Sequence, residues 1–324
     1  MEEERALSFK EVLEQLFKNE LVPVQHLYRL SDMADEQTVE FREHWHAAPD
    51  SRRKEIARHL ADLSEDNFVV DFAPLFSFML LDTHAPVRVA ALDGLWDCED
   101  EKLVDPIIGL MLDDPLVEVR AAAARSLTHY LLLTEWGQVP GRKATTIFDA
   151  LRSVYEDQDS ALLLKGAALE AMGPLTHPRV HAYIEESYEG PEPELQRSAL
   201  FAMGTSADPR WLPVLLDEME SPHAEIRAEA ARAAGSIGAS ESIPQLSELA
   251  LDEDDDVARI AVGALAHIGG EQVNRVLEDL LADASMAHLH GAIEEGMEES
   301  IWMDGELQLF PGSDSDLEQG SELI

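Results

Sequence analysis

The chain has 324 residues, with 65 Asp and Glu against 24 Lys and Arg, so its formal net charge is -41. This excess argues against direct binding to nucleic acid or to anionic membrane surfaces, because both need clustered Lys and Arg. One cysteine excludes an internal disulfide. The apolar runs, such as Leu131–Leu133, are far shorter than the roughly 20 residues of a membrane-spanning helix. Since Met1–Glu4 contains no basic segment of the kind that opens a secretory signal, we expect a cytoplasmic protein without membrane insertion.

The strong acidity has three interpretations that the sequence leaves open. Like charges keep molecules apart and therefore favour a soluble, monomeric protein. A salt-adapted host produces the same bias, and lysine is scarce here, with only six residues. The third interpretation is that an acidic surface recognises a basic partner.

Residues 1–66 are predicted to be helical, without the repeat that follows them. Pro49 with Asp50 and Ser51 indicates a turn and a helix start. We interpret this part as a helical N-terminal cap of one or two degenerate repeats, because a repeat array needs its end covered. The candidate helices are Ser8–Lys18, Pro23–Ser31, Glu36–Ala47 and Ser51–Leu63.

An internal repeat dominates residues 67–303. Its template is an apolar residue at position 0, Ala at +4, a small or apolar residue at +5 and +8, and an apolar residue at +11. At about 100° per residue, positions 0, +4, +8 and +11 share one helix face. Ala at +4 allows a close approach of another helix, where overpacking costs about 1–3 kcal/mol. The template begins at Val87, Val119, Leu164, Leu195, Ile226 and Val257, and +4 is Ala in all six copies.

A first helix is predicted before each template helix, which makes the unit a helix, a turn and a second helix. The apolar anchors of the first helices lie 11 residues upstream, at Phe76, Ile108, Ile184, Leu215 and Leu246. Carboxylates five residues before position 0 can cap the second helix. These are Asp82, Asp114, Asp159 and Asp252. The spacing of 45 between Val119 and Leu164, against 31 or 32 elsewhere, predicts a longer connection or an extended helix around Thr134–Gly141.

The C-terminal end departs from the template. Gln272–Ala282 and Ser285–Ile301 are predicted to form a final helix pair. Residues 304–324 are rich in Gly, Ser, Asp and Glu and are expected to form an acidic, disordered tail. The apolar residues from Ile301 to Phe310 either fold back on the cap or serve as a short binding motif.

The pattern Asp-x4-Val-Arg-x2-Ala, as in Asp82–Ala91 and Asp114–Ala123, resembles the HEAT repeats of bacterial proteins, in the variety named after phycobilisome lyases. The resemblance implies an all-α, right-handed α-solenoid of HEAT-like helix pairs with helical caps. It also implies a ladder between neighbouring repeats, made by the Asp and by the Arg that follows position 0. The basic column is Arg88, Arg120, Lys165 and Arg227, but Gln196 and Ala258 interrupt it, as Gly190 and Ser221 interrupt the Asp column.

No catalytic, cofactor or metal site is expected. His177 and His181 stand four residues apart, but Pro178 marks a helix start between them, and a metal needs three or four convergent ligands. Cys98, at +11, is expected to be a small core residue. Deoxyhypusine hydroxylase, which shares the repeat, binds iron through His-Glu dipeptides, and this chain contains none. No residue set marks a chromophore site of the bilin lyases.

The resemblance places the second helices on the concave surface of the array. Their positions +2, +6 and +9, opposite the buried face, then give a strip of Trp96, Arg125, Arg197, Phe201, Arg232 and Arg259. Arg, Trp and Phe are enriched in interface cores. We therefore expect a non-catalytic scaffold or adaptor whose strip binds another protein, a peptide or acidic groups. The alternatives are that the long side chains only cover neighbouring helices, or that the chain is a lyase or chaperone-like modifier of a cofactor-bearing client.

Overall fold

The computed structural model describes residues 7–31, 33–66 and 69–309, and every regular element within them is helical. The chain divides into two compact units, Met1–Met172 and Gly173–Ile324, whereas the sequence suggested boundaries after residues 66 and 303. The first unit contains α1 (Phe9–Lys18), α2 (Asp35–Ala47), α3 (Asp50–Asp66), α4 (Ala73–Met79), α5 (Ala85–Gly94), α6 (Val104–Asp113), α7 (Val117–Glu135), α8 (Gly141–Glu156) and α9 (Leu162–Met172), with 3-10 turns Val24–Leu30 and Glu101–Leu103.

The second unit continues the alternation of helices. Its elements are α10 (Pro178–Glu189), α11 (Pro193–Thr205), α12 (Leu212–Glu218), α13 (Ala224–Ile237), α14 (Ile243–Leu249), α15 (Asp255–Ile268), α16 (Gly270–Ala282) and α17 (His290–Leu309). Three 3-10 turns, Pro209–Trp211, Ser240–Ser242 and Ala284–Leu289, connect them. Helix α17 runs to Leu309, so residues 304–309 of the expected tail are helical, and 310–324 lie outside the described residues.

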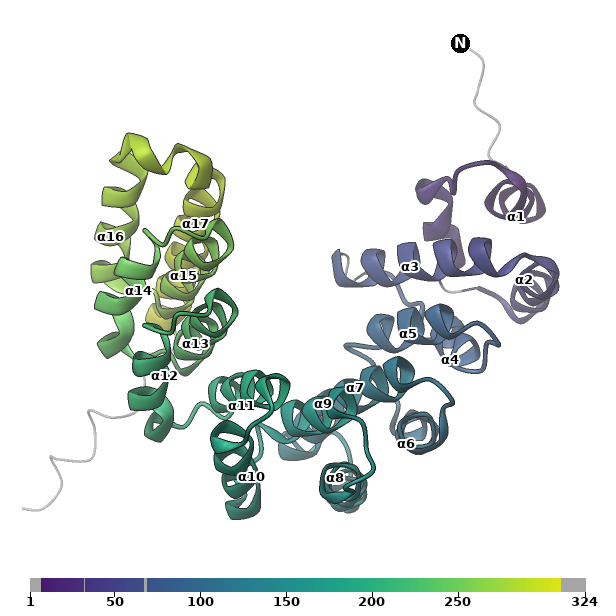
Figure 1. Cartoon of the computed structure of the whole chain (residues 1–324). Helices are drawn as coiled ribbons and strands as arrows, with labels where there is room; N and C mark the ends of the chain where they lie inside the picture. The colour runs from purple at the N-terminus through teal and green to yellow at the C-terminus, as the bar shows by residue number, and fades with distance from the viewer. Residues whose placement is uncertain (1–6, 32, 67–68, 310–324) are drawn as a thin grey trace, which may run out of the picture. The chain divides into compact units, whose positions relative to one another are not determined.

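The helices form an all-α solenoid of pairs, as the repeat predicts (Figure 1). In the first unit the second helices α3, α5, α7 and α9 each contact the next, and α4, α6 and α8 pack against them. In the second unit α11, α13, α15 and α17 do the same, paired with α10, α12, α14 and α16. Each unit therefore has one layer of first helices and one layer of second helices.

The predicted alanine column lies in the core. The Ala at +4 is 0% exposed in all six copies: Ala91, Ala123, Ala168, Ala199, Ala230 and Ala261. The first-helix anchors are buried as well, except in α6, where Ile107 and not Ile108 points inward. The period of the template therefore predicted the second helices more accurately than the short first helices.

Glycine allows the second helices of the second unit to approach still more closely. A Cβ atom at Gly204 would lie 2.6 Å from the Cα atom of Ala233, and one at Gly235 would lie 2.8 Å from the Cα atom of Ala264. Both glycines occupy position +9, which the sequence analysis placed on the outward face. That assignment is wrong in these two helices, because position +9 meets position +7 of the next second helix.

The extra residues between the second template, which begins at Val119, and the third, which begins at Leu164, are divided between two helices. Helix α7 extends to Glu135, α8 begins at Gly141, and the connection between them is short. At this connection Gly137 adopts φ 75°, and the amides of Gln138 and Val139 donate to the carbonyl of Leu133. Of the two predictions for this segment, the extended helix is confirmed.

Arginine and aspartate link neighbouring repeats, as the resemblance implied. Arg88 donates to both carboxylate oxygens of Asp114 at 2.8 and 2.9 Å, and Arg227 donates to both oxygens of Asp252 at 2.8 Å. The remaining Nη1 of Arg227 donates to the backbone carbonyl of Ser221, so the missing Asp at that position does not interrupt this rung. Lys165 and Gln196 make no ladder bond to another described residue, so the ladder is partial.

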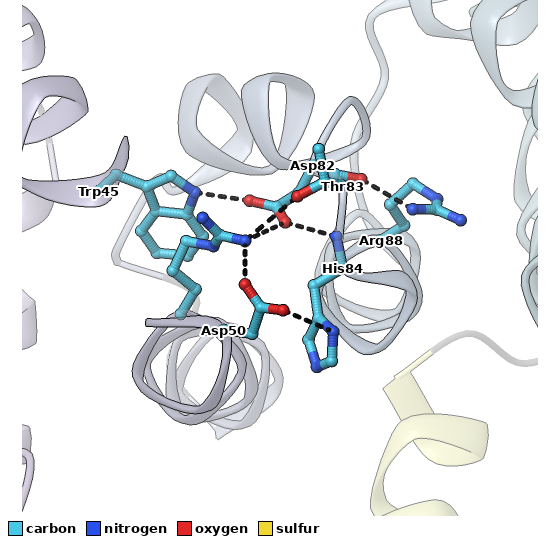
Figure 2. A network of polar contacts seen from close by, with 7 residues as sticks. Trp45, Asp50, Asp82, Thr83, His84 and Arg88 are labelled. Carbon is cyan, nitrogen blue, oxygen red and sulfur yellow. Dashed lines mark hydrogen bonds and ion pairs between the residues drawn. The ribbon is translucent and has the colours of Figure 1, made fainter. Parts of the chain in front are cut away.

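The ladder has an N-terminal rung that the sequence analysis did not predict (Figure 2). Asp82 accepts hydrogen bonds from the indole Nε1 of Trp45 at 2.8 Å and from the backbone amide of His84 at 2.8 Å. Arg53, at the start of α3, lies 3.2 Å from the same carboxylate and 2.7 Å from Asp50. Helix α3 is therefore the second helix of a repeat, although it lacks the Ala template.

The predicted caps need two corrections. Asp82, Asp114 and Asp252 accept from the amide two residues ahead, in the turn before the helix, rather than from an amide of the first helical turn. In the third copy Asp157, and not the predicted Asp159, makes this contact. Asp254 is a true N-cap and accepts from Asp256 and Val257.

Gly235→Ala should lower the free energy of unfolding by about 1–3 kcal/mol, because the added methyl would lie 2.7 Å from the Cβ atom of Ala264. Gly263→Ala is the matched control. It adds the same methyl inside α15 where no atom lies within 4 Å, and should raise stability by up to about 1 kcal/mol. Urea denaturation followed by circular dichroism measures both, and equal effects would contradict the close approach.

Asp252→Asn should destabilise the chain by about 3 kcal/mol at neutral pH, because it breaks a largely buried ion pair. The hydrogen bonds from Arg227 hold the pKa of Asp252 below its ordinary value. The ionised carboxylate therefore stabilises the fold above about pH 4, and this contribution is lost as the pH falls through the lowered pKa.

The difference in unfolding free energy between wild type and Asp252→Asn should accordingly shrink below about pH 4. The control Glu253→Gln removes the same charge from the neighbouring exposed residue and should have little effect at any pH. A difference for Asp252→Asn that persists unchanged into acid would show that the ion pair does not cause it.

Candidate functional site

A groove lies across the second helices α3, α5 and α7 of the first unit. It consists of two adjoining cavities of about 750 and 450 Å3 that share Arg58, Val89 and Glu118 as lining residues. Apolar side chains form much of its wall. They are Ala85, Pro86, Val89, Ala90, Leu92, Trp96, Leu116, Val119, Ala122 and Leu132. Helix packing places these residues together, because α5 contacts both α3 and α7.

Trp96 and Arg125 are the two predicted site residues that this groove brings together. Trp96 is 39% exposed and its indole Nε1 donates to the carbonyl of Ser64 at 3.4 Å. Since α5 ends at Gly94, Trp96 reaches the groove from the turn after the helix and not from the predicted +9 helical position. Arg125 projects from α7 as expected.

The predicted residues of the second unit do not form one site. Arg232 and Arg259 line a hollow of about 400 Å3 between α13 and α15, together with His267. Arg197 lines a different hollow of about 420 Å3. Phe201 is 37% exposed on α11 and lines neither of them.

Three of the four predicted arginines are already in ion pairs. Arg125 donates to Glu170 at 2.7 Å, Arg232 to Glu229 at 2.6 Å and Arg259 to Asp256 at 2.5 Å. Only Arg197 has no hydrogen bond or ion pair to another described residue. The arrangement thus leaves less positive charge for acidic groups than the sequence suggested.

Several groove residues were absent from the predicted strip. Lys54 and Arg58 come from α3, which the sequence analysis assigned to the cap because it lacks Ala at +4. Arg53, in the register of the later ladder arginines, was the signal that could have identified α3 as a second helix. Val89 stands at position +2 of its template, so the same helical period could have placed it in the strip.

Cys98 is half-buried and follows the end of α5, so its predicted place on a buried helical face is wrong. Burial raises the pKa of its thiol. His129, which lines the larger cavity, has its pKa lowered by burial. At neutral pH this histidine therefore adds no positive charge to the groove.

A metal site needs three or four convergent ligands and a membrane-spanning helix needs about 20 apolar residues, and both requirements apply to the described residues. Within them, no group of three or more His, Cys, Asp or Glu is placed to hold a metal ion. His177 caps α10, where its side chain accepts from the amide of Arg179. None of the helices within the described part is long and apolar enough to cross a membrane.

Comparison with protein families identifies the repeat. A family model described as HEAT repeats matches residues 180–266 and 212–297. Residues 180–297 therefore contain HEAT repeats. These matches cover α10 to α16 and reach into α17. The same alanine template recurs in α5, α7 and α9 of the first unit. None of the curated proteins matches this sequence.

The solved structures that match this chain include three of different origin. The complex of CpcE and CpcF of phycocyanin lyase from Nostoc has 16% identity over 71% of this chain and 95% of that chain, with a TM-score of 0.47. YibA of Escherichia coli has 15% identity over 93% and 99%, with a TM-score of 0.40. Human deoxyhypusine hydroxylase has 16% identity over 92% and 96%, with a TM-score of 0.31.

Cys98 should react slowly with iodoacetamide at neutral pH, because the thiolate is the nucleophile and the fold disfavours it. We expect a rate about tenfold or more below that of the urea-unfolded chain, rising as the pH increases. Mass spectrometry of the alkylated thiol follows the reaction. Equal rates in the folded and unfolded chain would show that the thiol is neither shielded nor raised in pKa.

Proposed function

We propose that this chain is a protein-binding scaffold, and that its groove across α3, α5 and α7 receives a segment of a partner protein. The observation that supports this most directly is the continuity of the two cavities, which offer one extended hollow with apolar walls. Trp96 and Leu116 are 39% and 47% exposed at this hollow, and partly exposed large apolar residues mark binding surfaces when they gather in one place.

The construction of the groove suits a scaffold. Its residues come mostly from helices, which the ladder and the buried alanine column fix relative to one another within the unit. A preformed surface loses little conformational entropy when a partner binds. Binding therefore needs no rearrangement of α5 and α7 beyond their side chains.

A photoreactive side chain at Leu116 should cross-link the chain, in its own host, to one short segment of one protein. Leu112 is the matched control, since it is also a leucine, 40% exposed, but lies on the first helix α6 and lines neither cavity. Mass spectrometry of the cross-linked peptides identifies the segment.

Val89→Asp tests whether the cross-link depends on the groove, because it places a charge on the wall shared by both cavities. It should remove the cross-link at Leu116, with a loss of affinity above about tenfold, while circular dichroism stays unchanged. Cross-links that are the same from both positions, or that survive Val89→Asp, would contradict the proposal. A visible absorption band or bound metal in the purified chain would instead favour a modifier of a cofactor-bearing client.

A further inference from the structure

The charges that remain unpaired in the groove are mainly negative. Glu65 and Glu118 both line it, both are exposed, and neither makes a hydrogen bond or ion pair with another described residue. Glu118 lines both cavities, whereas Glu65 lines the larger one. Among the described Lys and Arg residues that line the groove, Lys54 alone makes no hydrogen bond or ion pair with another described residue.

The arginines of the groove are neutralised from within the chain. Arg58 donates to Asp62 at 2.8 Å and to Asp93 at 2.7 Å, so two carboxylates share one guanidinium group. Arg125 is held by Glu170, whose side chain is only 15% exposed. An acidic partner would have to displace the carboxylates that already pair with these arginines. A basic partner can instead pair directly with Glu65 and Glu118, which have no partner among the described residues.

The field of the whole chain acts in the same direction. A net charge of -41 attracts cations over a distance set by the ionic strength, and it repels acidic peptides. Electrostatic complementarity of this kind governs the choice of partner and the rate of association. The apolar walls between the carboxylates require apolar side chains on the partner as well.

We infer that the groove binds a cationic, amphipathic segment of a partner protein, with apolar side chains on Val89 and Trp96 and with Lys or Arg at Glu65 and Glu118. The inference rests on the proposed function and specifies the chemistry of the partner. It reverses the expectation that the arginine strip receives acidic groups.

Two synthetic peptides of about 14 residues test the inference, each with Leu at the helical period. One carries Lys at its polar positions and the other carries Glu at the same positions, so their apolar faces are identical. Isothermal titration calorimetry with the full chain should show binding of the Leu/Lys peptide about tenfold or more tighter than that of the Leu/Glu peptide. Its affinity should fall as the salt concentration rises.

Two double variants separate local from overall charge. Glu65→Gln with Glu118→Gln should weaken the Leu/Lys peptide by about fivefold or more. Glu36→Gln with Asp113→Asn removes the same charge from exposed residues of α2 and α6 outside the groove, and should change the affinity less than about twofold. Equal weakening by both pairs would show that net charge alone attracts the peptide and would overturn the inference.

The outcomes also separate this inference from the proposed function. If the Leu/Glu peptide binds as tightly as the Leu/Lys peptide and Val89→Asp abolishes its binding, the groove is a binding site but its partner is not basic. If Val89→Asp affects neither peptide, the groove is not the site and both proposals fail. If neither peptide binds, the inference fails, while cross-linking at Leu116 still decides the proposed function.

Discussion

The close approach of second helices is the constraint on which the rest of this structure depends. Ala at +4 is fully buried in every copy, and in the second unit Gly204 and Gly235 face backbone atoms of the next second helix at distances that no Cβ atom could occupy. Because the helices meet over small residues, their backbones form a continuous layer within each unit. Larger side chains such as Trp96 and Arg125 lie at the surface of that layer in the first unit, where they line the groove.

The ladder complements this packing with directional contacts. Each bidentate pair joins the start of one second helix to the turn of the next repeat, which sets the register between them. The rung at Asp82 extends the same device to α3 and brings Trp45 of α2 into it (Figure 2). One wall of the groove, formed by Lys54 and Arg58, is positioned by this rung.

The sequence predicted what depends on a regular period and missed what depends on contacts across repeats. The alanine column predicted six second helices correctly. The anchor of one first helix, Ile108, was placed one residue too far along the chain. Helix α3 was not predicted to be a second helix, because it carries Ile56 where the template requires Ala. It nevertheless contacts the next second helix as the others do. The ion pair between Arg125 and Glu170 joins residues 45 positions apart across the insertion, so no local pattern reveals it. For the same reason the sequence overestimated the free positive charge of the strip, and only the structure identifies Glu65 and Glu118 as unpaired carboxylates of the groove.

The most direct test of the account is hydrogen exchange of the full chain, alone and saturated with the partner identified by cross-linking. The central claim is that binding takes place on the second-helix layer of the first unit. The account predicts new protection at the groove-lining segments, residues 85–96 and 116–132, with little change in the first helices α4 and α6. Protection confined to α4 and α6, or to the second unit, would contradict it.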